Sequence, residues 1–204
     1  MKETLLSKSD RTRRLIIEKT APLFNKKGIA GTSLADITRI TGLTKGSIYG
    51  NFKNKDELVL AAFQFSVENL NRFLDREVST IQSPLDKLFA ISNAYRKLYH
   101  RMISYGGCPI LNAATDADDT HPALARLAIQ TVKQFQDRLT GLVDQAKAAG
   151  EIDPAVDAEI FAETALSLLE GGLMLSKLTG SKRYLMNALA DLEARIHRMA
   201  VSGR

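Results

Sequence analysis

The sequence predicts an all-α protein of about nine helices, and three observations support this fold class. Apolar residues recur at helical spacing along nearly the whole chain, and neither strand-like alternation nor a hairpin turn of the Asn-Gly kind occurs. Capping residues, glycines and prolines mark starts and stops at intervals that fit helices. The 204 residues, 45% of them hydrophobic and 25% charged, suffice for one or two domains with a core.

The first third of the chain shows the boundaries of four helices. Ser33 is placed to cap one helix, and Asp36 three residues later completes a carboxylate form of the capping box. Gly42 can adopt a positive φ and close a tight turn, after which Thr44 caps another helix. The predicted helices cover 10–27, 34–41, 45–51 and a long segment from 53 past 73.

The rest of the chain is predicted to add five helices. Ser83-Pro84 starts the first of these, the stretch "YGGCPI" interrupts it, and Gly150 and Gly180 separate later helices. The expected spans are 84–104, 110–116, 123–149, 155–178 and 182–200. A domain boundary is expected within the long fourth helix, which gives an N-terminal domain over 9–69 and a larger domain over 70–204.

Composition excludes several function classes. The single cysteine and three scattered histidines lack metal-ligand spacing, and no catalytic or phosphate-binding motif is present, so we expect neither an enzyme nor a metal or other cofactor. No apolar run is long enough to span a bilayer, and the N-terminus lacks an apolar signal core, so we expect a cytoplasmic protein that does not enter the membrane.

Positive charge is concentrated at the start of the chain. Residues 1–60 hold 12 Lys and Arg against 6 Asp and Glu, whereas residues 61–204 hold 16 against 17. A basic lobe on a near-neutral body favours a polyanionic partner, with nucleic acid the leading candidate. A solubilising surface bias is the alternative.

The segment 32–51 fits a helix–turn–helix. Gly42 would form the turn, and four apolar side chains would hold the two helices together, namely Ile37, Ile40, Leu43 and Ile48. The second helix would then expose small or hydrogen-bonding residues to a DNA groove: Lys45, Gly46, Ser47, Tyr49, Gly50 and Asn51. Tyr49, Phe52 and Lys55 follow at three-residue spacing, with Phe52 suited to the core. A surface helical hairpin in an all-α protein is the alternative.

The stretch "TSLADITRITGLTKGSIYGNFKNKDEL", residues 32–58, resembles the DNA-binding region of the TetR/AcrR family of transcriptional regulators. The resemblance implies a homodimer that binds double-stranded DNA at a palindromic operator, usually represses transcription, and carries an effector pocket in its larger lobe. It places Thr44, Lys45, Gly46, Ser47 and Asn51 on the recognition helix. It also places Tyr49 and Lys55 at phosphate-contact positions, and Thr32 and Ser33 at the start of the preceding helix, where phosphate contacts are common.

The segment 106–119, "GGCPILNAATDADD", is similar to one that lines the ligand cavity in a subset of that family. The apolar walls and few polar groups expected there suit a small amphipathic or apolar effector. The candidate pocket residues are Tyr95, Tyr99, Met102, Ile103, Cys108, Leu111, Asn112, Phe135, Phe161 and Leu169. Ordinary core packing is the alternative for each of them.

Two further hypotheses concern Cys108 and the last helices. Because amides at a helix start lower the pKa of a thiol, Cys108 could sense oxidants or electrophiles; a small buried apolar role is the alternative. A ligand carrier without DNA binding is another alternative for the whole chain. Stripes on the last two helices suggest a four-helix dimer interface. Its candidate residues are Leu168, Gly172, Leu175, Leu189, Leu192 and Ile196, and core packing within the chain is the alternative, which is expected for part of each stripe.

Overall fold

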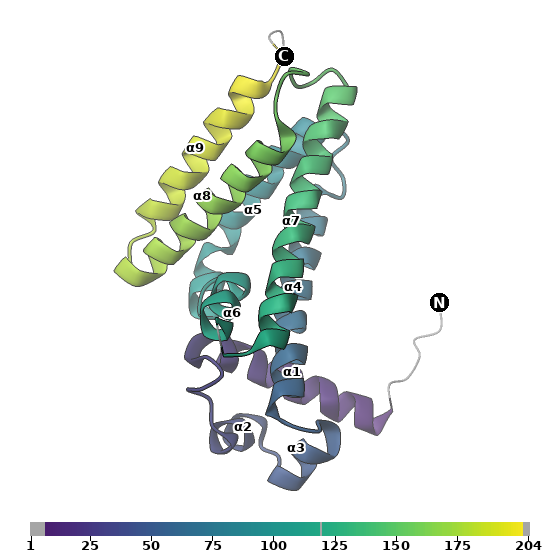
Figure 1. The fold of residues 1–204 in the computed structure, drawn as a ribbon, viewed down its shortest axis with the longest axis vertical. Coiled ribbons are helices and arrows are strands. Elements are labelled where there is room, and N and C mark those ends of the chain that lie inside the picture. Colours follow the sequence, from purple (N-terminus) through teal and green to yellow (C-terminus); the bar gives the residue numbers. More distant parts are fainter. Residues whose placement is uncertain (1–6, 119, 202–204) are drawn as a thin grey trace.

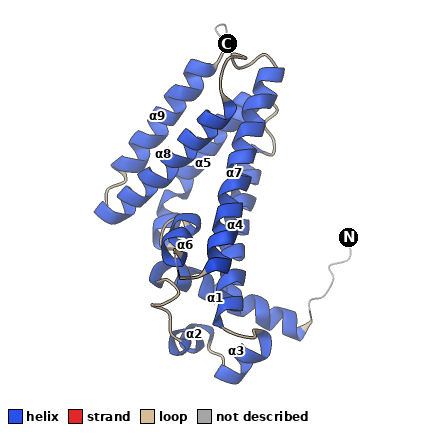
Figure 2. Ribbon diagram, viewed as in Figure 1, coloured by secondary structure: helices blue, strands red, loops and turns tan. Residues whose placement is uncertain are grey.

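The computed structural model describes residues 7–118 and 120–201, and within these ranges it contains nine helices and no extended strand (Figure 2). The helices are α1 (Lys8–Lys27), α2 (Leu34–Thr41), α3 (Lys45–Asn51), α4 (Lys55–Val78), α5 (Pro84–Ser104), α6 (Pro109–Ala117), α7 (Pro122–Ala148), α8 (Ala158–Thr179) and α9 (Arg183–Met199). The predicted all-α class is therefore confirmed. No helix in the described part of the chain is long and apolar enough to cross a membrane.

The helices form a small cluster at one end of an elongated bundle (Figure 1). The helices α1, α2 and α3 gather at this end, and α4 begins there and extends into the bundle, where it packs on α5 and α7. In the bundle, α8 lies between α7 and α9, and α5 packs behind them against α9 and α7. The short α6 lies between the bundle and α1, so it contacts both parts of the molecule.

Capping side chains fix six of the nine described helix starts, each within two residues of the predicted position. Ser33 and Asp36 form the expected capping box on α2, and the Thr44 hydroxyl accepts from the amide of Ser47 on α3. The prediction for α8 is wrong by three residues. That helix begins after Asp157, whose carboxylate accepts from two amides of the first turn, while the preceding segment pairs with the chain end through a bridge from Ile152 to Ala200.

The buried apolar residues continue from the small cluster through the bundle as one core. Ile37, Ile48 and Phe52 are each at most 2% exposed, which confirms their predicted place between the short helices. The prediction for Ile40 is wrong, because its side chain is 42% exposed on α2. Ile37 alone is buried on this eight-residue helix, since one short helix presents only a narrow face to the core.

Candidate nucleic-acid interface and ligand lobe

The turn between α2 and α3 has the geometry of a helix–turn–helix. Gly42 ends α2 in the left-handed conformation, with φ of 71°, and its amide donates to the carbonyl of Thr38. Thr44 then starts α3 two residues later. Because Ile37 and Ile48 are both buried, α2 and α3 are held against the rest of the cluster and the opposite side of α3 faces outward.

The outward side of α3 is unobstructed. Thr44, Lys45, Gly46, Tyr49 and Gly50 are all exposed, and Tyr49 is 43% exposed. A side chain at Gly50 would meet no atom within 4 Å, and one at Gly46 only the Thr44 hydroxyl at 3.9 Å. The Lys45 ammonium lies 6.0 Å from the centroid of the Tyr49 ring. This surface offers an ammonium, hydroxyls and exposed backbone, which are the groups that contact phosphates and base edges in a major groove.

Three of the predicted DNA contacts are engaged within the chain. Thr32 is fully buried, and its hydroxyl donates to the carbonyl of Gly28 over 2.8 Å, so a phosphate contact by this side chain does not fit the structure. The Asn51 amide donates to the Ser47 carbonyl over 2.9 Å. The Lys55 ammonium donates to the carbonyl of Ile29 and is half-buried, so it ties α4 to the turn before α2.

Two carboxylates of the small cluster are held in their ionised form by local hydrogen bonds. Hydrogen bonds from the Ser33 amide and hydroxyl, with Lys27 nearby, hold the pKa of Asp36 far below its usual range. Hydrogen bonds from the Lys53 amide and from Arg13 lower the pKa of Glu57. These carboxylates therefore stay ionised at neutral pH and pair with Lys27, Arg39 and Arg13, and none of these partners lies on α3.

Arg13 anchors α1 to the segment that joins α3 and α4. Its guanidinium lies 4.1 Å from the centroid of the Phe52 ring, donates to the carbonyl of Asn51, and pairs with Glu57 over 2.8 Å. The Arg13 side chain thus holds the C-terminal end of α3 against α1. The sequence did not single out Arg13, because its partners lie 38 to 44 residues away in the chain.

The cluster and the bundle are joined by polar contacts, which we call the α1–α6 clasp: Asn25, Gly28 and Ile29 on one side and Asn112 and Asp116 on α6. The amide of Asn112 donates to the carbonyl and side-chain oxygen of Asn25, at 3.0 and 2.9 Å, and to the carbonyl of Gly106 at 2.8 Å. The Asp116 carboxylate accepts from the Ile29 amide over 2.5 Å.

Glycines let these two segments come close. Gly28 has φ of 72°, and a side chain there would lie 2.7 Å from the Asp116 carboxylate. Gly106 has φ of 101°, and a side chain there would lie 2.8 Å from the Asn25 carbonyl. Both positions therefore require glycine for conformation and for space. The clasp joins α6 directly to the turn that leads into α2.

The predicted effector-pocket residues lie together around α5, α6, α7 and α8, mostly within the core. Those that are buried are Tyr95, Tyr99, Met102, Cys108, Phe135, Phe161 and Leu169, and those that are half-buried are Ile103, Leu111 and Asn112. Tyr95 and Phe135 meet edge to face at 6.4 Å between ring centroids. Met102 borders a cavity of about 90 Å³ and Asn112 one of about 290 Å³. Their role in effector binding stays a prediction.

Cys108 does not have the environment expected of a reactive thiol. It begins α6, and the amides of Ile110 and Leu111 act to lower its pKa, as expected for a helix start. Burial and the neighbouring Glu170 carboxyl outweigh them and raise the pKa of the thiol well above its ordinary value. The thiol donates to Glu170 over 3.0 Å, and burial also raises the pKa of that carboxyl. The structure therefore favours the buried structural role over the electrophile sensor.

The structure corrects four of the six predicted dimer residues. Gly172, Leu189, Leu192 and Ile196 are buried within the chain, where α8 packs on α9 and α9 packs on α5. A side chain at Gly172 would lie 2.9 Å from Ala188. Leu168 is half-buried and Leu175 is 37% exposed, so these two remain available. Periodicity alone could not separate the face of α8 that meets α9 from the face that meets solvent.

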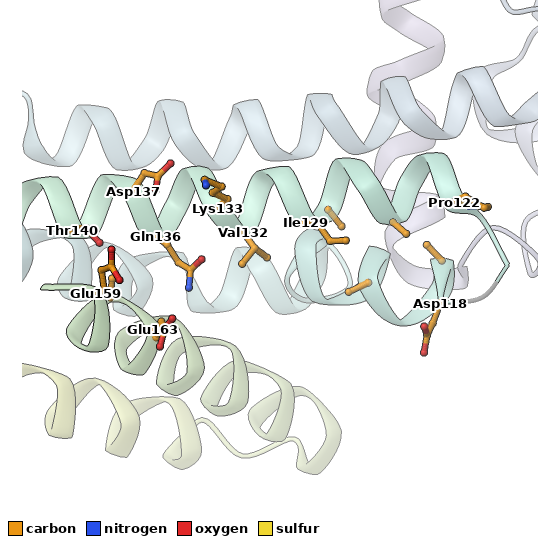
Figure 3. A pocket seen from close by; sticks show the side chains of 15 residues that line it. Asp118, Pro122, Ile129, Val132, Lys133, Gln136, Asp137, Thr140, Glu159 and Glu163 are labelled. Carbon is orange, nitrogen blue, oxygen red and sulfur yellow. The ribbon is translucent and has the colours of Figure 1, made fainter. Parts of the chain in front are cut away.

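Sequence reasoning also missed a groove of about 980 Å³ between α6, α7 and α8 (Figure 3). Its lining includes Ile129 and Val132 on α7 and Glu159 and Glu163 on α8. Ile129 is 68% exposed, which departs from the inward placement expected of isoleucine. The sequence feature that could have indicated it is the set of alanines that line it on α6 and α7, at positions 114, 117, 125 and 128.

Similarity to known proteins identifies the class and then the family. Residues 16–62 match the family described as bacterial regulatory proteins, tetR family, and residues 84–192 match the tetracyclin repressor-like C-terminal domain. These family matches, together with the fold and the exposed α3, define a helix–turn–helix transcriptional regulator and not an enzyme. The chain belongs to the TetR family.

Solved structures support this assignment over the full length. A TetR-family regulator from Cytophaga hutchinsonii is 37% identical, with 97% of this chain and 99% of that chain covered and a TM-score of 0.90. A TetR regulator from Chloroflexus aurantiacus is 33% identical, with 96% and 98% covered and a TM-score of 0.90. The probable HTH-type transcriptional regulator ArpR of Pseudomonas putida is 36% identical over 45% of this chain, and the match spans 43% of that regulator.

Proposed function

We propose that this chain is a homodimeric repressor that binds a palindromic operator and is released by a small-molecule effector. The observation that carries the proposal is the unobstructed outward side of α3, placed at the end of the molecule that holds the excess positive charge. Lys45, Ser47 and Tyr49 would read and position the operator, and Thr44 and Ser33 would support contacts at the helix starts. The protein would act in the cytoplasm, where the chromosomal operator lies.

DNA binding and effector binding are assigned to different parts of the chain. Residues 9–69 would bind DNA, and residues 70–204 would bind the effector and the second copy. The half-sites of the operator would lie about 34–36 Å apart, or a multiple of this spacing, because both recognition helices must enter the same face of the duplex.

The outward face of α8 is the proposed dimer surface. A stripe along it comprises Ile160, Thr164, Ser167, Gly171, Met174 and Leu178. Ile160 and Leu178, at the two ends of the stripe, are 61% and 78% exposed. Successive residues of the stripe are alternately four and three positions apart, and this pattern is the same when the helix is followed in either direction. Two copies of α8 can therefore pair in antiparallel fashion about a two-fold axis. The small Ser167 and Gly171 would lie at the crossing and allow close approach.

The α1–α6 clasp provides a route from effector to DNA beside the shared helix α4. Displacement of α6 by a bound effector would move Asp116 and thereby the turn at Ile29, which precedes α2. Such coupling requires two conformations of the dimer that differ in the distance between their DNA-binding ends, and an effector that binds one conformation more tightly than the other. An effector that leaves DNA affinity unchanged would contradict this mechanism.

The deciding experiment is the selection of genomic fragments by the purified protein, with Tyr49→Ala and Ser47→Ala beside it. Wild type should enrich one short palindrome, and both variants should lose it while retaining the thermal stability of wild type. Tyr105→Ala is the matched control, because Tyr105 is similarly exposed, at 47%, but lies at the end of α5. Failure of wild type to enrich any sequence at low salt would contradict the proposed function.

A further inference from the structure

The groove between α6, α7 and α8 is hollow because small residues line it. Five of its lining residues are alanines, at positions 114, 117, 125, 128 and 162, and Ile129 and Val132 form an apolar wall on α7. Its volume of about 980 Å³ lies at the upper end of the range of sites that take small organic molecules. The small alanine side chains therefore leave enough space in the groove for an apolar small molecule.

The polar groups of the groove are mostly acidic. The lining holds Asp118, Asp137, Glu159 and Glu163 against a single cation, Lys133. In Figure 3, Glu159 and Glu163 on α8 lie across the gap from Gln136 on α7, and Asp118 lies at the α6 end. None of the four carboxylates forms an ion pair with any other residue that the structure describes. This acidic lining contrasts with the net charge of +5 on the whole chain.

We propose that this groove binds a small organic cation with an apolar body. The alanines and Ile129 would cover the apolar part, and Glu159 and Glu163 would face the positive charge. A cation would be stabilised both by apolar burial and by attraction to the carboxylates, whereas a neutral molecule would gain only from apolar burial. An anion of the same shape would be repelled by the carboxylates. That the bound cation is the effector rests on the proposed function, whereas its binding to the groove does not.

Two ions of nearly the same shape and opposite charge test the proposal. Tetraphenylphosphonium and tetraphenylborate are titrated by calorimetry into the purified full-length chain, without DNA. Tetraphenylphosphonium should bind in the groove and tetraphenylborate should not, and the affinity of the cation should fall as salt increases. Equal binding of the two ions that is lost for both when Ala125→Phe fills the groove would overturn the proposal, because shape alone would then explain it. Tetraphenylborate bound at the basic N-terminal end would not respond to that substitution.

Variants then locate the bound ion. Glu163→Gln should weaken tetraphenylphosphonium binding about fivefold, as expected for the loss of one partly screened charge pair. Glu68→Gln, an exposed glutamate on α4 away from the groove, should leave it unchanged. Ala125→Phe should abolish binding by filling the hollow while leaving the far-ultraviolet spectrum and melting temperature near those of wild type. Equal effects of the two glutamate substitutions would overturn the assignment to this groove.

A second copy of the chain is the competing occupant, because the groove borders the stripe on α8. If neither ion binds and Glu163→Gln instead weakens self-association in sedimentation equilibrium, the second copy fills the groove and the proposal is wrong. If tetraphenylphosphonium binds but leaves DNA affinity unchanged, the site is supported and only its effector role is contradicted. The two failures are therefore distinguishable.

Discussion

Replacement of Asn112 by alanine should remove the Asn112 part of the α1–α6 clasp and lower the free energy of unfolding. The two N–H groups of the Asn112 amide share three acceptors at 2.8 to 3.0 Å, two of them on Asn25 and one on Gly106. Each half-buried hydrogen bond contributes about 1 kcal/mol net, and an acceptor left unpaired adds a desolvation cost. We therefore expect a loss of about 2 to 3 kcal/mol.

Urea denaturation followed by circular dichroism measures this loss, and Asn112→Asp and Thr115→Ala provide the comparisons. Asn112→Asp keeps the shape but removes the donors, so it should lose at least as much stability as Asn112→Ala. Thr115→Ala lies on the exposed side of the same helix and removes only hydrogen bonds to carbonyls of its own helix, so it should change stability by less than about 0.5 kcal/mol.

Amide hydrogen exchange gives a second, independent measure of the clasp. Residues 25–31 should exchange faster in Asn112→Ala, because the end of α1 then keeps only the Asp116 contact to α6. Equal stability of Asn112→Ala and Thr115→Ala, together with unchanged exchange in this segment, would refute the view that these amides join the two parts of the molecule.

Three further predictions address the dimer, the buried carboxyl and DNA binding. Gly171→Leu should shift the protein from dimer to monomer in sedimentation velocity, whereas Gly141→Leu on α7 should not. The two substitutions are comparable because a side chain at either glycine meets no atom of its own chain within 4 Å. Equal behaviour of the two variants would contradict the proposed dimer surface on α8. Burial raises the pKa of the Glu170 carboxyl, so its contribution to stability is fully present below the ordinary pKa of 4.5 and is lost as pH rises through the raised pKa. Glu170→Gln can still accept the hydrogen bond from Cys108 but does not ionise, so it should gain stability relative to wild type in denaturation series from pH 4.5 upward. A stability difference that stays constant with pH would contradict this. Lys45→Ala should weaken operator and random DNA alike and reduce the slope of log affinity against log salt by about 1; an unchanged slope would remove Lys45 from the phosphate contacts.

Much of the fold followed from local signals in the sequence. The capping box at Ser33 and Asp36, the turn at Gly42 and the cap at Thr44 depend on residues within four positions of one another, so their structural consequences could be deduced directly. The outward placement of Lys45 and Tyr49 followed as well, since it requires only that Ile48 point inward.

Other features depend on contacts between distant segments. Lys55 resembles a phosphate ligand in the sequence, yet its ammonium donates to the carbonyl of Ile29, 26 residues earlier in the chain. This partner became evident only when the end of α1 and the start of α4 were placed together. Cys108 is a similar case, because its helix-start amides are local whereas the Glu170 carboxyl that opposes them lies 62 residues away.

The sequence by itself determined the helical class, the basic N-terminal region and the helix–turn–helix, because periodicity, charge and capping are properties of neighbouring residues. Only the tertiary structure decided which face of α8 is free, how α6 joins the bundle to the turn before α2, and where a groove opens between α6, α7 and α8. A helix with apolar residues on more than one face can bury either of them. The choice depends on the shapes of the helices that pack against it, and those shapes are set by residues far away in the chain.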